Sequence, residues 1–152
     1  MEALKQNGIG CLAGRWLVQG RPLAVLIDVD DIQAHIPALR ESYFKRHNLK
    51  SSASSELIGN ALAFGEGVRI FLQGVAQHRD ETPCVVHFHE WQAATALPEL
   101  AESSPLFKTV FTTHATLLGR YLAGDLARAH EVFHTIEPSQ QAEKYGIAFE
   151  HG

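Results

Sequence analysis

Residues 86 to 122 read VHFHEWQAATALPELAESSPLFKTVFTTHATLLGRYL, and this stretch decides the fold class. An apolar run ends in polar residues, a helix-like segment follows, and the same pattern then occurs a second time. This order predicts a βαβ unit, with two parallel strands joined by a right-handed crossover. Ligands of such sheets bind beyond the carboxyl ends of the strands. The polar clusters at residues 87–91 and 112–116 are therefore predicted to form one shared site.

The segments before this unit predict a β-hairpin and two helices. Strand-like runs at residues 15–18 and 23–29 are separated by Gly20, Arg21 and Pro22, which is a join short enough for a hairpin. Residues 32–47 are predicted to be helical, with Pro37 in the first turn or at a kink.

A long helix is predicted over residues 56–77, with Ser54 or Ser55 as its N-cap. Its apolar stripe has steps of three and four and consists of Leu57, Ala61, Phe64, Val68, Phe71 and Val75. The helix also holds Gly59, Gly65, Gly67 and Gly74, and each glycine costs about 1 kcal/mol relative to alanine. Such a helix needs tertiary packing, and its glycines allow another backbone segment to approach closely.

The remaining pattern completes an α/β chain with few strands. Strands are predicted at residues 84–88 and 107–112, and helices at 92–102 and 115–122, with a weaker helical pattern from Asp125 and a last piece starting at Pro138. The total of about four strands is fewer than the five or six of a usual sheet.

Composition and charge exclude several classes of protein. The net charge is -4 and the basic residues are scattered, which argues against a nucleic-acid surface. Cys11 and Cys84 form no disulfide framework, and Cys84 falls in an apolar strand where a free thiol is usual. Because no apolar run approaches the roughly 18 residues of a membrane span and the N-terminus has no signal-peptide pattern, a soluble cytoplasmic protein without membrane contact is expected.

The first polar cluster allows two interpretations. His87 and His89 are two residues apart, so in a strand they point to the same face. With His114 they could bind a metal ion, but no fourth ligand with clear spacing is present, and His87 hydrogen-bonded in the core is the simpler interpretation. His89 falls where strand meets helix and could exchange a hydrogen bond with a ligand hydroxyl. Glu90 is equally explained by the helix dipole, and Trp91 is expected in the core.

The second polar cluster has a capping and a binding interpretation as well. Thr112 or Thr113 could cap the next helix. Their hydroxyls, with His114 and free backbone N–H groups, could equally bind a sugar hydroxyl or a phosphate. Arg120 lies nearly two turns further on a related face, although an exposed arginine on a solvated helix explains it equally well.

These clusters resemble the glycogen synthases of the animal and fungal type. The family carries an HFHEW motif, matched by residues 87–91, and an FTTHATLLGRYL motif, matched without a gap by residues 111–122. Residues 14–29 resemble the family's GRWLIEG-like hairpin and the hydrophobic strand that follows it. The resemblance covers most of the chain in order and fades past Gly124.

The resemblance implies a fold and a function. The family consists of retaining glycosyltransferases with two Rossmann-like domains (the GT-B fold). Residues 1–152 would be a single partial domain from the middle of the N-terminal one: an α/β fold with a partial Rossmann-like parallel sheet, flanking helices and an N-terminal β-hairpin. The implied reaction transfers glucose from a nucleotide-glucose, with UDP-glucose as the expected donor, to the non-reducing end of an α-1,4-glucan with retention.

The resemblance also implies site residues and partners. His89 would contact the transferred glucose as the catalytic residue, and the substrate-binding residues would be Glu90, Thr113, His114, Thr116 and Arg120. No cofactor or metal is expected. The full enzyme would be a homo-oligomer that binds glucan and nucleotide sugar, and its C-terminal domain is missing here. The isolated chain is therefore expected to be inactive.

Two other functions stay open at this point. A stand-alone sugar- or glucan-binding module would keep the binding residues without catalysis. A metal-dependent hydrolase would use His87, His89 and His114 as ligands. A truncated gene product with exposed strand edges would aggregate.

Overall fold

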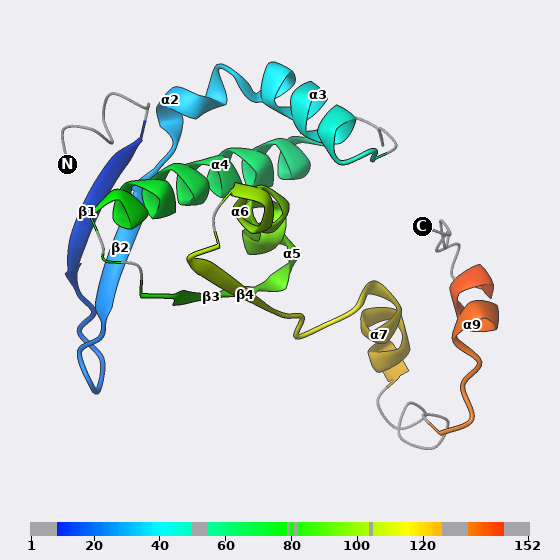
Figure 1. Cartoon of the computed structure of the whole chain (residues 1–152). Coiled ribbons are helices and arrows are strands. Elements are labelled where there is room, and N and C mark those ends of the chain that lie inside the picture. Colours follow the sequence, from blue (N-terminus) through cyan, green and yellow to red (C-terminus); the bar gives the residue numbers. More distant parts are fainter. Residues whose placement is uncertain are drawn as a thin grey trace. The chain divides into compact units, whose positions relative to one another are not determined.

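The computed structural model describes residues 9–49, 55–78, 80, 82–103, 105–125 and 134–144 (Figure 1). The described residues form helices, an antiparallel hairpin and a parallel pair of strands, which confirms the predicted α/β class. The chain divides into two compact units, Met1–Thr112 and Thr113–Gly152, and each is described by itself. No helix in the described ranges is long and apolar enough to cross a membrane.

The first unit begins with the predicted hairpin. Strand β1 (Gly10–Arg15) pairs antiparallel with β2 (Leu23–Asp28), in a register that runs from Gly10 opposite Asp28 to Arg15 opposite Leu23. The predicted position of the first strand was wrong, because residues 16–18 lie in the connection. Small residues in β1 weaken its sequence signal, and pairing with β2 overrides that local preference.

Two short helices replace the single helix predicted over residues 32–47. Helix α2 (Asp30–Gln33) follows the hairpin, and α3 (Ile36–Arg46) begins after a break. Pro37 lies in the first turn of α3, as predicted. There the missing N–H of proline costs no helical hydrogen bond, and its fixed φ suits a helix start.

Helix α4 (Glu56–Gln77) has the predicted bounds, and Ser55 is its N-cap residue. Residue 54 lies outside the described ranges. The predicted buried stripe was only partly right, because Leu57 is 57% exposed and Phe64 is 39% exposed. The buried residues of α4 are instead Gly59, Ala61, Leu62, Ala63, Gly65 and Gly67. Neighbouring segments approach this surface so closely that only small side chains fit along most of it.

The parallel pair consists of β3 (Cys84–His89) and β4 (Phe107–Thr112), with His89 opposite Thr112. Both strands were predicted, and β3 runs one residue further than expected. The chain between them forms α5 (Glu90–Ala93), the 3-10 turn η1 (Ala94–Ala96) and α6 (Leu97–Ser103). The continuous helix predicted over residues 92–102 was wrong, because Pro98 has no N–H for a helical hydrogen bond.

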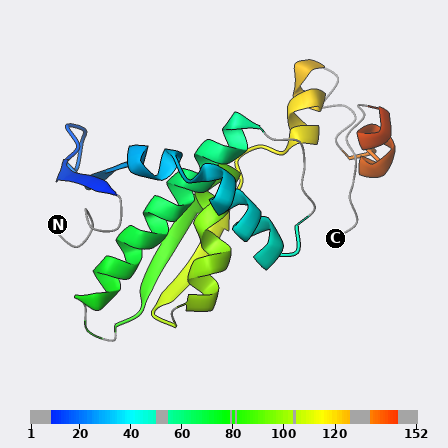
Figure 2. The same ribbon diagram turned by 90° about the horizontal axis from the view of Figure 1, so that it is seen from above.

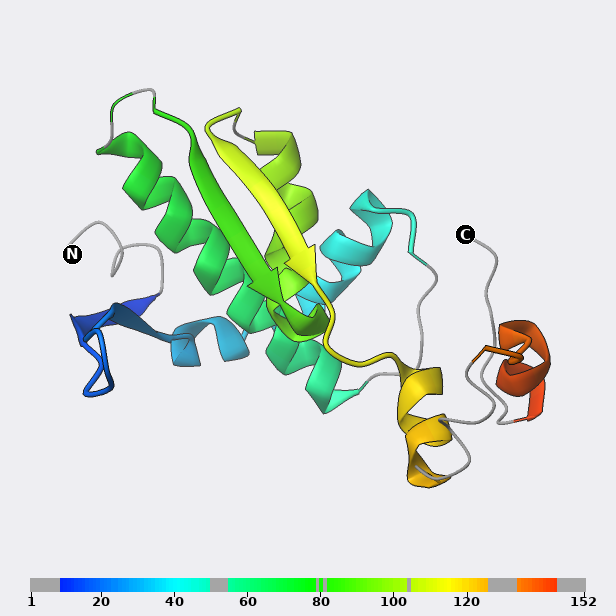
Figure 3. The ribbon, with the colours of Figure 1, turned by 90° about the horizontal axis from the view of Figure 1, so that it is seen from below.

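One face of the parallel pair carries the core of this region. Phe88 and Phe107 pack there with Ala96 and Leu100, and α4 adds partly buried side chains such as Leu72. Figure 2 shows α4 and α6 lying over the strands, and Figure 3 shows the strands from the other side with both helices behind them. On that other face, within the described residues, Val85 is 66% exposed. The histidines of β3 therefore belong to an open sheet face.

The hairpin contributes a second cluster of buried residues. Ile9, Ile32 and Ala63 are buried together, with Cys11 and Ile27 packed against them. The opposed pair of Leu12 and Leu26 is largely exposed. Apolar side chains thus occupy both faces of this hairpin. Among the described residues, the face with Cys11 and Ile27 is covered, and the face with Leu12 and Leu26 is exposed.

The second unit contains short helices. Helix α7 (Leu117–Leu122) is followed by the 3-10 turn η2 (Ala123–Asp125), and α9 (Pro138–Lys144) comes later. Pro138 starts its helix as predicted. Helix α7 begins two residues after the predicted start at 115, and the residues from 126 to 133 lie outside the described ranges.

The contact of α4 at Gly65 generates the first prediction. A Cβ at this position would meet the Thr95 hydroxyl and the Ala96 backbone nitrogen. We expect Gly65→Ala to lower the free energy of unfolding by about 1 to 2 kcal/mol, because overpacking outweighs the gain in helix propensity. Urea denaturation measures this.

Gly59→Ala is the matched control in the same helix, since its Cβ would meet only the side chain of Ile36. That side chain can shift, so we expect a change of less than about 1 kcal/mol. Equal losses of stability in the two variants would contradict the special role of Gly65.

Candidate functional site

The carboxyl ends of the parallel strands carry a pair of exposed histidines. His87 and His89 lie on the same face of β3, as their spacing predicted. Their ring centroids are 4.1 Å apart and the ring planes are inclined by 35°. This position, beyond the core and at the end of a parallel strand, is where α/β proteins bind ligands.

A hydrogen bond links the histidine pair to the neighbouring strand. His87 Nε2 and Thr112 Oγ1 are 2.8 Å apart, and Thr112 is the last residue of β4. The interpretation of His87 as a hydrogen-bonded core residue was right about the bond and wrong about burial, because His87 is exposed. His87 is exposed because it lies on the same face of β3 as the exposed Val85, opposite the core. The predicted proximity of the two strand ends is confirmed for His87, His89 and Thr112.

The backbone changes direction abruptly just after His89. Glu90 has φ of 65°, in the left-handed region, and it opens helix α5. This conformation costs a residue with a Cβ about 1 to 2 kcal/mol. Two other described non-glycine residues share it, Arg21 in the hairpin connection and Asn48 just beyond α3, where such turns are common. Strain of this kind at a ligand-binding end of a sheet is a frequent property of functional sites.

The adjoining Trp91 differs from its prediction. It was expected in the core, but it is 44% exposed. Phe88, three positions earlier, takes the buried place instead, because it lies on the face of β3 that packs against Ala96 and Leu100.

The second polar cluster belongs to the second unit, where Thr113, His114, Thr116 and Arg120 are all exposed. Thr116 caps α7, because its Oγ1 accepts a hydrogen bond from Gly119 N–H at 2.9 Å. The prediction that Thr112 or Thr113 caps this helix was wrong. The Thr113 hydroxyl instead donates to the Ala115 carbonyl at 3.1 Å.

Arg120 lies in the last turn of α7, where a cation is favoured by the helix dipole. Among the described residues, no three histidine, cysteine, aspartate or glutamate side chains are grouped so that they could hold a metal ion.

A polar pocket of about 260 Å³ lies between α3, α4 and the η1–α6 segment. Among its lining residues are Tyr43, Arg46, Glu66, Arg69 and Glu99. No pattern in the sequence predicted this pocket. The pairing of Glu66 with Arg69, three positions apart on one helix, was a readable signal, whereas the contact of α3 with α6 depends on tertiary packing.

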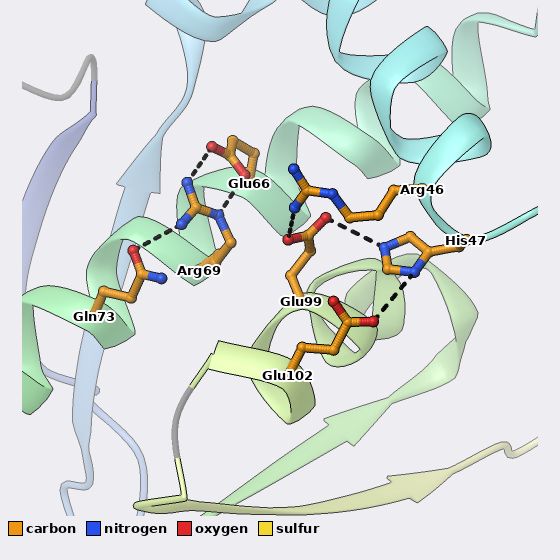
Figure 4. Close-up of polar contacts among 7 residues, drawn as sticks. All are labelled: Arg46, His47, Glu66, Arg69, Gln73, Glu99 and Glu102. Carbon is orange, nitrogen blue, oxygen red and sulfur yellow. Dashed lines mark hydrogen bonds and ion pairs between the residues drawn. The ribbon is translucent and has the colours of Figure 1, made fainter.

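The charges that line this pocket are paired within the protein. Glu99 bonds to Arg46 and, at 3.2 Å, to His47 Nε2, and Glu102 lies 4.0 Å from the other nitrogen of His47. Figure 4 shows this group beside a second one in which Arg69 bonds to Glu66 and to Gln73. The hydrogen bond to Glu66 raises the pKa of Arg69. The pairs of Glu99 join the end of α3 to α6, and the pairs of Arg69 lie within α4. Because these charges already have partners, the pocket is a weaker candidate for a ligand site than the strand ends.

The comparison with known protein families covers nearly the whole chain. The sequence model described as glycogen synthase matches residues 1–150. The chain belongs to the glycogen synthase family. This confirms the resemblance seen in residues 87–91 and 111–122.

Several curated relatives in this family are similar at the same level. The chain is 33% identical to glycogen [starch] synthase of Neurospora crassa over 97% of its own length and 21% of that protein. It is 30% identical to isoform 2 of Saccharomyces cerevisiae, again over 97% of the chain and 21% of the relative. The liver enzyme of Mus musculus is 34% identical over 80% of the chain and 17% of that protein. The chain thus spans about a fifth of the length of the relatives it matches most fully.

The ion pairs of Glu99 generate a prediction about Tyr43. Burial raises the pKa of Tyr43 above its ordinary value of 10.0, and the Glu99 carboxylate raises it further. We expect Glu99→Gln to lower the pKa of Tyr43, while Glu41→Gln on the same helix leaves it unchanged. A pH titration of the tyrosine ring signals by NMR measures this.

The same pKa determines how stability depends on pH. Because folding raises the pKa of Tyr43, its contribution to stability is present below pH 10.0 and is lost as the pH rises through the folded-state pKa. An unchanged Tyr43 titration in Glu99→Gln would show that the carboxylate is not near the phenol.

The cap of α7 generates a separate prediction. Thr116→Ala removes the acceptor for Gly119 N–H and should cost about 1 kcal/mol of local stability. Hydrogen exchange at the Gly119 amide should become faster. Thr116→Ser keeps the hydroxyl and should keep the slow exchange, so equal exchange in both variants would disprove the cap.

Proposed function

We propose that this chain is part of a glycogen [starch] synthase, an enzyme that transfers glucose from a nucleotide-glucose to the non-reducing end of an α-1,4-glucan with retention. The observation that carries the proposal is the family match over residues 1–150, together with the exposed histidine pair at the carboxyl end of β3. The proposed donor is UDP-glucose. In this proposal the chain lies within the N-terminal Rossmann-like domain of a cytoplasmic GT-B enzyme.

His89 is the proposed catalytic residue. An exposed imidazole at a strand end can exchange a hydrogen bond with a hydroxyl of the transferred glucose and so hold the sugar in one orientation. Orientation is worth much in a retaining transfer, because the acceptor hydroxyl must attack from the face that the diphosphate leaves. Glu90, Thr113, His114, Thr116 and Arg120 stay predicted substrate-binding residues.

The departing nucleotide diphosphate makes a second chemical demand. Its developing negative charge needs a preorganised cation or a set of N–H donors. In the first unit, Arg46 and Arg69 of the polar pocket are paired with glutamates. We therefore propose that the diphosphate clamp comes from a C-terminal domain of the complete enzyme, and that the 152 residues alone have no transfer activity.

A transfer assay tests the proposal. We expect the intact gene product to incorporate labelled glucose from UDP-glucose into glycogen, and the 152-residue chain to give none. In the intact protein, His89→Ala should lower kcat by about a hundredfold, because the sugar loses its positioning group. His35→Ala, an exposed histidine on the loop before α3, is the matched control and should keep the activity.

Several results would overturn the proposal. Robust turnover by the 152-residue chain would show that no further domain is needed. Saturable binding of oligosaccharide without transfer by the intact protein would favour a sugar-binding module. Retained activity in His89→Ala would remove His89 from the catalytic role.

A further inference from the structure

We propose that His87 and Thr112 are positioning residues that fix the ring orientation of His89. The inference rests on the proposed function, because it gives His89 a task for which orientation matters. It assigns a role to two residues that the sequence pattern explained as a core histidine and a helix cap.

A hydrogen bond joins the ends of the two strands. Thr112 Oγ1 lies 2.8 Å from Nε2 of His87, and a threonine in a strand has few χ1 states. This contact holds the His87 ring by one nitrogen. It also reaches across from β4 to β3, so the ring position follows the strand pairing.

The rings of the two histidines are in contact with each other. The centroids of His87 and His89 are 4.1 Å apart with planes inclined by 35°. At that separation the two rings are in van der Waals contact, so His89 cannot turn toward His87 without displacing it. A held His87 ring therefore limits the rotamers of His89.

The backbone restrains His89 from the other side. His89 is opposite Thr112 in the ladder, which fixes its main chain. Glu90, which follows directly, is held in the left-handed region with φ of 65°. The main chain on both sides of His89 therefore has a defined conformation, and the contact with His87 acts on the side-chain torsions of His89.

Packing does not account for the His87–Thr112 bond. The core of this region lies on the opposite face of the sheet, around Phe88 and Phe107. His87 is exposed, so water competes for its hydrogen bond and the net contribution to stability is small. The hydrogen bond between His87 and Thr112 is better explained by the orientation that it gives to the His87 ring.

The test removes the Thr112 hydroxyl and leaves the side-chain shape intact. In the 152-residue chain with labelled histidine, NMR should show a nuclear Overhauser effect between the rings of His87 and His89. We expect Thr112→Val to abolish it and to shift the ring nitrogen signals of both histidines. Thr112→Ser should restore the wild-type signals. Thr109→Val removes a hydroxyl from the same strand, three positions away, and should leave both rings unchanged.

A second readout uses the intact gene product. If His89 is misoriented, Thr112→Val should lower kcat about tenfold with little change in KM, and Thr112→Ser should recover most of it. A merely structural role would lower the thermal midpoint and leave kcat of the folded enzyme as it was.

The two proposals fail in distinguishable ways. An unchanged ring–ring effect in Thr112→Val overturns the positioning role, whatever the enzyme does. Absence of glucosyl transfer by the wild-type gene product overturns the proposed function, while loss of the ring–ring effect in Thr112→Val would still support the orienting contact.

Discussion

The close contact between α4 and the turn at Thr95 is the constraint on which the first unit depends. Gly65 lets the helix approach the Thr95–Ala96 backbone, and the Thr95 hydroxyl donates to the Ala61 carbonyl at 2.8 Å. This turn lies between α5 and α6, so its position determines where both helices meet the parallel strands. A larger residue at 65 would separate α4 from the segment that follows the histidine pair.

This contact also explains which parts of the fold the sequence could predict. Both parallel strands and the bounds of α4 follow from local pattern, because apolar runs and caps are encoded within a few residues. The buried face of α4 could not be predicted in this way. The helical periodicity of large apolar residues favours one face, whereas the close contact with Thr95 and Ala96 places small residues at the buried face. The break at η1 was missed for a related reason: Pro98 and the Thr95 bond act against an otherwise helical pattern.

The candidate site was predictable to a similar degree. The spacing of His87 and His89 gave their common face, and the βαβ order gave their position at the strand ends. The bond to Thr112 depends on the register between β3 and β4, which no local pattern specifies. The ion pair between Arg46 and Glu99 could not be predicted for the same reason, because the two residues lie 53 positions apart in the sequence. Thr116, by contrast, was a readable cap, since its hydroxyl precedes α7 directly.

The conformation of Glu90 has a consequence at the level of the gene. Glycine adopts a positive φ without a steric penalty, and glutamate and glycine codons differ by a single base. A more relaxed backbone at position 90 is thus always one mutation away from this chain. Glu90→Gly would relieve the strain of this backbone and would remove the carboxylate that directly follows the histidine pair.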